Sequence, residues 1–184
     1  TGLPHAFNII DGYNGLAGMV GVTILGGIAY VAFKLNDPEI MIAALVMMGA
    51  ILGFLVFNYP RGLIFLGDGV AYLIGFWVAE LSVLLTARHP EVSKWFPLLL
   101  CAYPIFETLF TIYRRIVIHR THPGMPDAAH LHQMIYKRVV RWAVGSNESV
   151  DMVVRNSLTA PYLWVLTAMA VIPAVLFWNN AWRS

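Results

Sequence analysis

The sequence predicts an all-α protein, a polytopic bundle of about five transmembrane helices. Hydrophobic residues make up 59% of its 184 residues and charged residues 12%, whereas soluble domains contain about 45–50% and about 25%. The mean hydropathy is +0.68. A helix that crosses a bilayer needs roughly 20 mostly apolar residues, and five segments qualify: Gly15–Phe33, Ile40–Phe57, Gly69–Thr86, Trp95–Tyr113 and Leu158–Trp178.

The composition also excludes several classes of protein. So few charged residues cannot cover a globule of this size with a polar surface, which excludes a soluble enzyme and a disordered tail. The net charge of +2 is too small for a protein that binds nucleic-acid phosphates. The single cysteine, Cys101, lies in an apolar run, so there is no disulfide framework. We expect residues 1–184 to form one transmembrane domain.

The predicted spans differ in their small and helix-breaking residues. The first span is uncharged and rich in glycine, which suits close contact between helices in lipid. The fourth and fifth spans each contain two prolines. Because neighbouring helices can satisfy the carbonyls that a proline frees, we expect both segments to cross the membrane.

The basic residues predict the orientation. Five spans place the N-terminal stretch, residues 58–68 and residues 114–157 on one side, and this side carries eight of the twelve Lys and Arg residues. Positive charge concentrates on the cytoplasmic side of a membrane, so we expect these segments to be cytoplasmic. Within 114–157, apolar residues at helical spacing predict an amphipathic helix, which lies on the membrane surface or packs on the other loops: Leu131, Met134, Ile135, Val139 and Trp142.

A first polar cluster stands just before the first span. Asn8, Asp11 and Asn14 recur every three residues, so on a helical turn they share one side. Asp and Asn also favour helix N-caps, but one residue suffices for a cap. Capping therefore explains Asn14 better than the whole triplet.

A second cluster precedes the third span. Asp68 stands between Gly67 and Gly69, directly before the apolar run. It is either a functional carboxylate or an N-cap. Arg61, seven residues earlier, can be explained as a positive anchor on the cytoplasmic side.

A third cluster lies in the long loop. It contains Arg114 and Arg115 at its start, then His119, Arg120, His122, Asp127, His130 and His132. Arg and His side chains suit the binding of phosphate oxygens, although a solvated basic loop is also usual beside a cytoplasmic membrane surface. Mg²⁺ takes one or two carboxylates together with substrate phosphates. Asp11 and Asp68, faced by these cations, therefore predict a site for a metal-bound pyrophosphate next to lipid.

Two acidic residues fall inside the predicted spans. Glu80 and Glu107 would each be costly if they faced lipid. Glu107 lies two turns before Arg114, so we expect it to border the site. We interpret Glu80 as a buried structural or interhelical contact.

Four segments together resemble a known family: Asn8–Gly18, Phe57–Gly69, Pro104–Arg115 and Pro126–Gln133. In this order and between these spans, they are similar to the polyprenyl-phosphate N-acetylhexosamine-1-phosphate transferases. This is glycosyltransferase family 4, which includes the peptidoglycan enzyme phospho-N-acetylmuramoyl-pentapeptide transferase. The resemblance implies a magnesium-dependent (or manganese-dependent) reaction at the cytoplasmic face of a bacterial inner membrane. Undecaprenyl phosphate would attack the β-phosphorus of a UDP-amino-sugar and release UMP.

The resemblance also implies roles for individual residues. Asp68 matches the metal-binding aspartate, and Asp11 with Asn8 and Asn14 matches the nucleotide-facing motif. His130 and His132 match the histidine motif that contacts the phosphates or the sugar. Arg114 and Arg115 match the basic end of the following helix. We therefore expect Asp68, Asp11, His130 and His132 to be catalytic, and Asn8, Asn14, Arg114 and Arg115 to bind substrate.

The sequence departs from the family pattern in four places. Asn14 and Glu107 stand where aspartate is common, and Gln133 where histidine is frequent. These exchanges favour an enzyme that initiates an O-antigen or similar surface polysaccharide. The fourth departure is that no Asp-Asp pair occurs, although family members carry one in an earlier loop. We therefore expect the chain, which begins at Thr1 without Met, to be the later half of a longer transferase, inactive alone.

Two other functions remain open at this stage. A non-enzymatic membrane module, such as a transporter half or an assembly subunit, would not need Asp11 and Asp68 to converge. An interaction or scaffold protein with an inactive transferase fold is the third possibility. A homodimer is compatible with all three, and nucleic acid is a partner in none.

Overall fold

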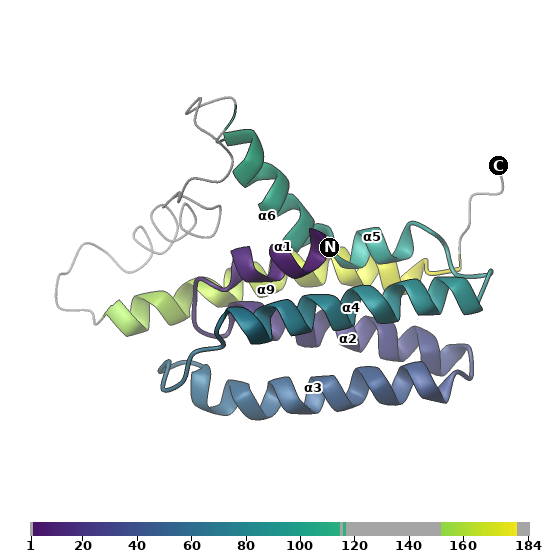
Figure 1. The fold of residues 1–184 in the computed structure, drawn as a ribbon, viewed down its shortest axis with the longest axis horizontal. Coiled ribbons are helices and arrows are strands. Elements are labelled where there is room, and N and C mark those ends of the chain that lie inside the picture. Colours follow the sequence, from purple (N-terminus) through teal and green to yellow (C-terminus); the bar gives the residue numbers. More distant parts are fainter. Residues whose placement is uncertain (1, 115, 117–151, 180–184) are drawn as a thin grey trace.

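The computed structural model describes residues 2–114, residue 116 and residues 152–179, and for residues 152–156 it describes the backbone alone. All regular secondary structure in this part of the chain is helical (Figure 1). The helices are α1 (Gly2–Ile10), α2 (Leu16–Lys34), α3 (Pro38–Asn58), α4 (Asp68–Arg88), α5 (Phe96–Leu100), α6 (Ala102–Tyr113) and α9 (Met152–Leu176). The predicted all-α class is confirmed.

Helix α2 forms the centre of the bundle, where it contacts α3, α4 and α9. Its glycines allow these close approaches, because a Cβ atom on Gly18, Gly21 or Gly27 would come within 2.9 Å of a neighbouring side chain. The three neighbours lie on three different helices: Leu55 on α3, Ile74 on α4 and Leu100 on α5. The predicted use of glycine for close helix contact is confirmed.

Among the residues that the structure describes, four helices are long and apolar enough to cross a membrane: α2, α3, α4 and residues 157–176 of α9. Their bounds lie within two residues of the predicted ones at both ends of α2, α3 and α4. Helix α9 stays continuous through Pro161 and Pro173, as predicted.

The predicted fourth span, Trp95–Tyr113, is wrong as a single helix. It divides at Cys101 into α5 and α6, and Figure 1 shows α6 leaving the direction of the bundle. Pro104 supplies the physical reason, because its ring nitrogen cannot donate to the carbonyl four residues earlier and its ring crowds that carbonyl. Cys101 accordingly departs from helical geometry, with φ −93° and ψ 15°.

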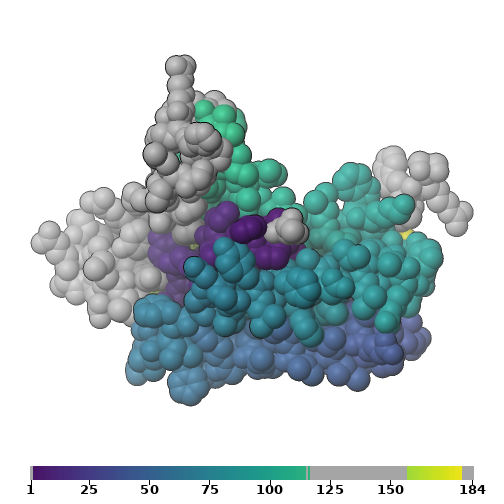
Figure 2. All heavy atoms as spheres, viewed as in Figure 1, coloured from purple at the N-terminus to yellow at the C-terminus, as the bar shows by residue number. Residues whose placement is uncertain are grey.

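Helix α1 was not predicted, because nine residues are too few for a span. It packs against α4 and α6 and is visible between them in the space-filling view (Figure 2). Phe7 and Ile10 are fully buried. The backbones of α1 and α4 approach closely, since a Cβ on Gly75 would lie 2.6 Å from the Pro4 Cα.

The helix order produces two chemically different ends. The turn 11–15 and the loop 59–67 lie at one end, which we call the Asp68 end (left in Figure 1). The connections 35–37 and 89–95 lie at the other, the Asp37 end. There the Asp37 carboxylate accepts hydrogen bonds from the Ile40 amide at 3.2 Å and from Arg88 at 3.4 Å, and it lies 3.0 Å from His89 Nε2.

Candidate functional site

Two carboxylates meet at the Asp68 end. Asp11 lies in the turn that follows α1, and its amide donates to the Asn8 carbonyl at 3.3 Å. Asp68 is the first residue of α4 and is exposed. Burial raises the pKa of Asp11 to about 6, and the nearby charge of Asp68 adds to the increase. The structure therefore places the two side chains close enough for electrostatic repulsion.

Neither Asp68 nor Asn14 is a helix cap, so the capping interpretations are wrong. Gly67, with φ +75°, occupies the cap position of α4, and Gly15, with φ +76°, occupies that of α2. A glycine has no side chain that could accept a capping hydrogen bond at either position. Positive φ favours glycine at both positions, which leaves the neighbouring polar residues available for other contacts.

The predicted common face of Asn8, Asp11 and Asn14 is also wrong. Helix α1 ends at Ile10, so only Asn8 lies on it, half-buried. The chain then reverses through residues 11–15 before α2 begins. Asn14 is buried, and its side-chain Nδ2 atom donates to the Pro60 carbonyl at 3.2 Å. It therefore contacts the loop before Asp68 rather than sharing a helix side with Asp11.

Asn58 joins the two segments that carry the carboxylates. Its Oδ1 atom accepts from the Gly15 amide at 2.6 Å, and its Nδ2 atom donates to the Ile64 carbonyl at 2.8 Å. The Asn58 side chain is 5% exposed. Asn58 lies in the segment Phe57–Gly69 that resembles the family, but no role was predicted for it; a polar residue at the end of an apolar span was the available signal.

Helix α9 contacts both the loop 59–67 and the turn 11–15. Ser157 donates to the Pro60 carbonyl, and Trp164 Nε1 donates to the Gly15 carbonyl at 3.2 Å. The rings of Tyr59 and Trp164 pack with centroids 4.9 Å apart. Gly15 lies beneath these rings, and a Cβ there would come within 2.8 Å of Tyr59. Sequence reasoning missed these residues because the contacts join positions about 100 residues or more apart.

The basic and histidine residues are only partly described. Arg114 follows α6 and is 8% exposed, and Glu107 is fully buried on the same helix. Helix α6, which carries Glu107, contacts α1, α5 and α9. Arg61 is exposed in the loop before Asp68. Arg115, His130, His132 and the predicted amphipathic helix lie outside the described residues.

Glu80 contradicts its prediction as a buried contact. It is exposed on α4, next to the exposed Phe76 and Val83. The helical period explains the difference, because the buried side of α4 runs through Ile74, Val78, Leu81 and Leu85, and Glu80 points away from that side.

The described side chains offer a metal two carboxylates. No group of three or more His, Cys, Asp or Glu side chains that could hold a metal occurs in the described part of the chain. The pair Asp11 and Asp68 nonetheless fits Mg²⁺, which keeps several waters and uses one or two protein carboxylates. Burial and the charge of Asp68 both raise the pKa of Asp11, and a bound divalent cation would offset both effects.

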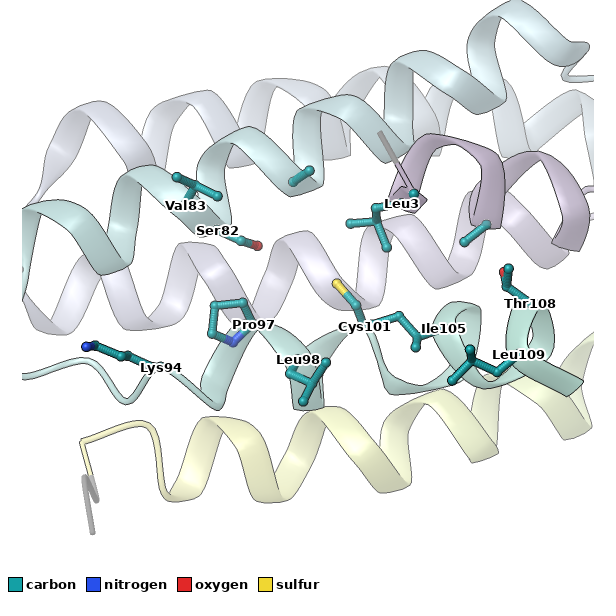
Figure 3. Close-up of a pocket in the computed structure, with 13 residues that line it drawn as sticks. Leu3, Ser82, Val83, Lys94, Pro97, Leu98, Cys101, Ile105, Thr108 and Leu109 are labelled. Atoms are coloured by element: carbon teal, nitrogen blue, oxygen red, sulfur yellow. The ribbon is translucent and has the colours of Figure 1, made fainter. Parts of the chain in front are cut away.

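An apolar groove runs along the bundle beside α1. Its volume is about 500 Å³, and residues of α1, α4, α5 and α6 line it (Figure 3). The break at Cys101 creates one wall, because α5 and α6 meet there at an angle. Most lining side chains are apolar, among them Leu3, Val83, Leu98 and Leu109, with Lys94 near one end. The lining suits a hydrocarbon chain.

Comparisons with known proteins point to one family. Residues 1–86 match the family model described as glycosyl transferase family 4. The chain is 33% identical over 136 residues to a probable undecaprenyl-phosphate N-acetylglucosaminyl 1-phosphate transferase of Bacillus subtilis, covering 73% of this chain and 38% of that protein. It is 28% identical over 142 residues to an undecaprenyl-phosphate alpha-N-acetylglucosaminyl 1-phosphate transferase of Thermotoga maritima, covering 77% and 42%.

A third relative performs a different named transfer. The chain is 25% identical over 179 residues to a phospho-N-acetylmuramoyl-pentapeptide-transferase of Leuconostoc citreum, covering 97% of this chain and 50% of that protein. The chain thus spans half or less of the length of these three curated relatives.

Proposed function

Because the chain belongs to glycosyl transferase family 4, we propose that it forms the membrane-embedded carboxylate site of a polyprenyl-phosphate hexosamine-1-phosphate transferase. In the complete protein, an oxygen of undecaprenyl phosphate bonds to the β-phosphorus of a UDP-N-acetylhexosamine. The bond from that phosphorus to UMP breaks, and the product is a lipid-linked pyrophosphoryl sugar. The names of the Bacillus and Thermotoga relatives support this acceptor and this transferred group.

The pair Asp11 and Asp68 carries the proposal. Two acidic side chains from segments 57 residues apart in the sequence lie at the same end of the bundle, and both burial and the charge of Asp68 raise the pKa of Asp11. Bound Mg²⁺ or Mn²⁺ would supply charge neutralisation for the phosphates. Asp11 and Asp68 would hold that ion, and Asn8 lies one turn before Asp11. Phosphoryl transfer depends mainly on such positioning and electrostatic stabilisation.

The remaining predicted residues complete the proposal. Arg114 and Arg115, with His130 and His132, would bind phosphate oxygens, as cationic side chains do. The groove beside α1 (Figure 3) would receive the polyprenyl chain. We place the site at the cytoplasmic face of a bacterial inner membrane, because that side carries most of the Lys and Arg residues. The pathway proposed is the start of an O-antigen or similar surface polysaccharide.

The test is UMP release from UDP-N-acetylhexosamines in membranes that contain the complete gene product and added undecaprenyl phosphate. Asp68→Asn should abolish release at every Mg²⁺ concentration, and His130→Ala should lower the rate sharply without loss of folded protein. Asp37→Asn is the matched control, since it removes one carboxylate from the opposite end of the bundle. Normal turnover by Asp68→Asn would remove Asp68 from the site, whereas no UMP release by the wild-type protein would favour a non-enzymatic membrane module.

A further inference from the structure

The loop that leads to Asp68 has few apolar anchors. Of its side chains, Arg61, Leu63, Ile64 and Phe65 are exposed, and only Leu66 is buried. Exposed loops without buried contacts open at low free-energy cost. Something else must hold this loop if the position of Asp68 is to be fixed relative to Asp11.

Asn58 provides that hold. Its side-chain oxygen binds the Gly15 amide at 2.6 Å, four residues after Asp11. Its side-chain nitrogen binds the Ile64 carbonyl at 2.8 Å, four residues before Asp68. The Asn58 backbone carbonyl accepts from the Gly62 amide at 2.6 Å as well. One buried residue thus connects the segment of one carboxylate to the segment of the other.

Neighbouring contacts fix the same geometry. Asn14 donates to the Pro60 carbonyl, which Ser157 also reaches. Gly62, with φ +62°, lies so close to Asn14 that a Cβ would come within 2.6 Å of its amide nitrogen. Buried and mutually supporting hydrogen bonds of this kind make a polar network rigid.

We propose that Asn58 is a positioning residue that sets the separation of Asp11 and Asp68. The inference rests on the proposed function, because the separation matters only if the two carboxylates act on one substrate complex. Asn58 acts through Gly15 and Ile64 and has both side-chain polar atoms engaged. A misplacement of about 1 Å in a catalytic group can lower a rate by about a hundredfold.

The experiment uses the complete gene product with spin labels on cysteines introduced at Gly12 and Val70. Both positions are exposed, and each lies within two residues of one carboxylate. Asn58→Ala should broaden the distribution of label distances. In unlabelled protein it should lower kcat by about tenfold to a hundredfold, with the KM for the UDP-sugar changed less than about twofold and the half-saturating Mg²⁺ concentration raised.

Two further variants keep the test decisive. Trp77→Phe is the control, because it removes a side-chain hydrogen bond to the backbone of another segment, from Trp77 Nε1 to the Ala43 carbonyl at 3.1 Å, away from both carboxylates. It should change neither the distance distribution nor kcat. Gly62→Ala displaces the loop from Asn14 and leaves the Asn58 side chain unchanged, so it should broaden the distribution of label distances. It serves as the test if Asn58→Ala does not fold.

The outcomes separate the two proposals. An unchanged distance distribution in folded Asn58→Ala overturns the positioning role, and so does a broadened distribution with unchanged kcat. If the wild-type protein transfers no sugar phosphate, the proposed function fails. The label distances then still show whether Asn58 sets the geometry of the two segments.

Discussion

The two ends of the bundle shift the pKa of an aspartate in opposite directions. At the Asp37 end, burial by itself would raise the pKa of Asp37, but hydrogen bonds from His89 and the Ile40 amide and the charge of Arg88 lower it below 3.8. At the Asp68 end, burial and a second carboxylate raise the pKa of Asp11 to about 6. One carboxylate is matched by protein donors, and the other is opposed by a like charge.

This difference distinguishes structure from function. A carboxylate that accepts hydrogen bonds from the protein stabilises the fold without a bound cation. Two carboxylates that repel each other weaken the fold unless a cation joins them, and perturbed pKa values of this kind cluster at functional sites. We therefore propose that Asp37 stabilises the bundle and that the pair at the Asp68 end takes part in the chemistry.

The largest expected effect is on activity. Asp11→Asn should lower the rate of UMP release by at least about a hundredfold, because it removes one of the two charges that would hold the cation. Asp37→Asn should keep the rate within about threefold of wild type. Equal losses in the two variants, measured in the same membranes, would contradict the distinction between the ends.

The next effect is on the docking of α1, which delivers Asp11. Gly75→Ala should destabilise the protein by about 1–3 kcal/mol, as overpacking does, because its Cβ would meet the backbone of Pro4 at 2.6 Å. Gly53→Ala on α3 is the control, since a Cβ there meets nothing within 4 Å. Thermal unfolding in detergent should show a lower Tm for the first variant only.

The stability of the Asp37 end should depend on pH in one direction. The pKa of Asp37 is lowered in the folded protein, so its contribution is fully present above the unfolded value near 3.8 and is lost as the pH falls through the folded value. Asp37→Asn should therefore lower the stability by about 1–3 kcal/mol at pH 7. A difference in Tm that stays constant down to pH 3 would contradict this account.

The smallest effect has the opposite sign. The folded pKa of Asp11 lies above its unfolded value, so its ionisation destabilises the fold increasingly between pH 4 and 6 and constantly above that. Without Mg²⁺, Asp11→Asn should raise the stability at pH 8 by about 1–2 kcal/mol, less than the full shift because the side chain is partly exposed. The gain should nearly vanish at pH 4; a gain independent of pH would refute the repulsion.

Much of the fold followed from local patterns in the sequence. The lengths of the apolar runs predicted α2, α3 and α4 to within two residues, because hydropathy alone determines where a chain can enter a bilayer. The alternation of spans predicted that Asp11 and Asp68 lie at the same end. This prediction required only that successive spans begin on alternate sides of the membrane.

Other features depend on tertiary contacts that no local pattern contains. Pro104 interrupts a span whereas Pro161 does not, and the sequence pattern alone does not distinguish the two positions. The hydrogen bonds of Asn58 and Trp164 join segments 43 and 149 residues apart. The exposure of Glu80 likewise depends on which side of α4 its neighbours cover.

We propose that the carboxylate pair at the Asp68 end binds the catalytic cation. The most direct test of this proposal is the increase in Tm that Mg²⁺ produces in the purified complete protein at pH 8, since a ligand that binds the folded state stabilises it. We predict the same increase for wild type and Asp37→Asn and none for Asp68→Asn. An undiminished increase in Asp68→Asn would place the cation elsewhere and contradict the account.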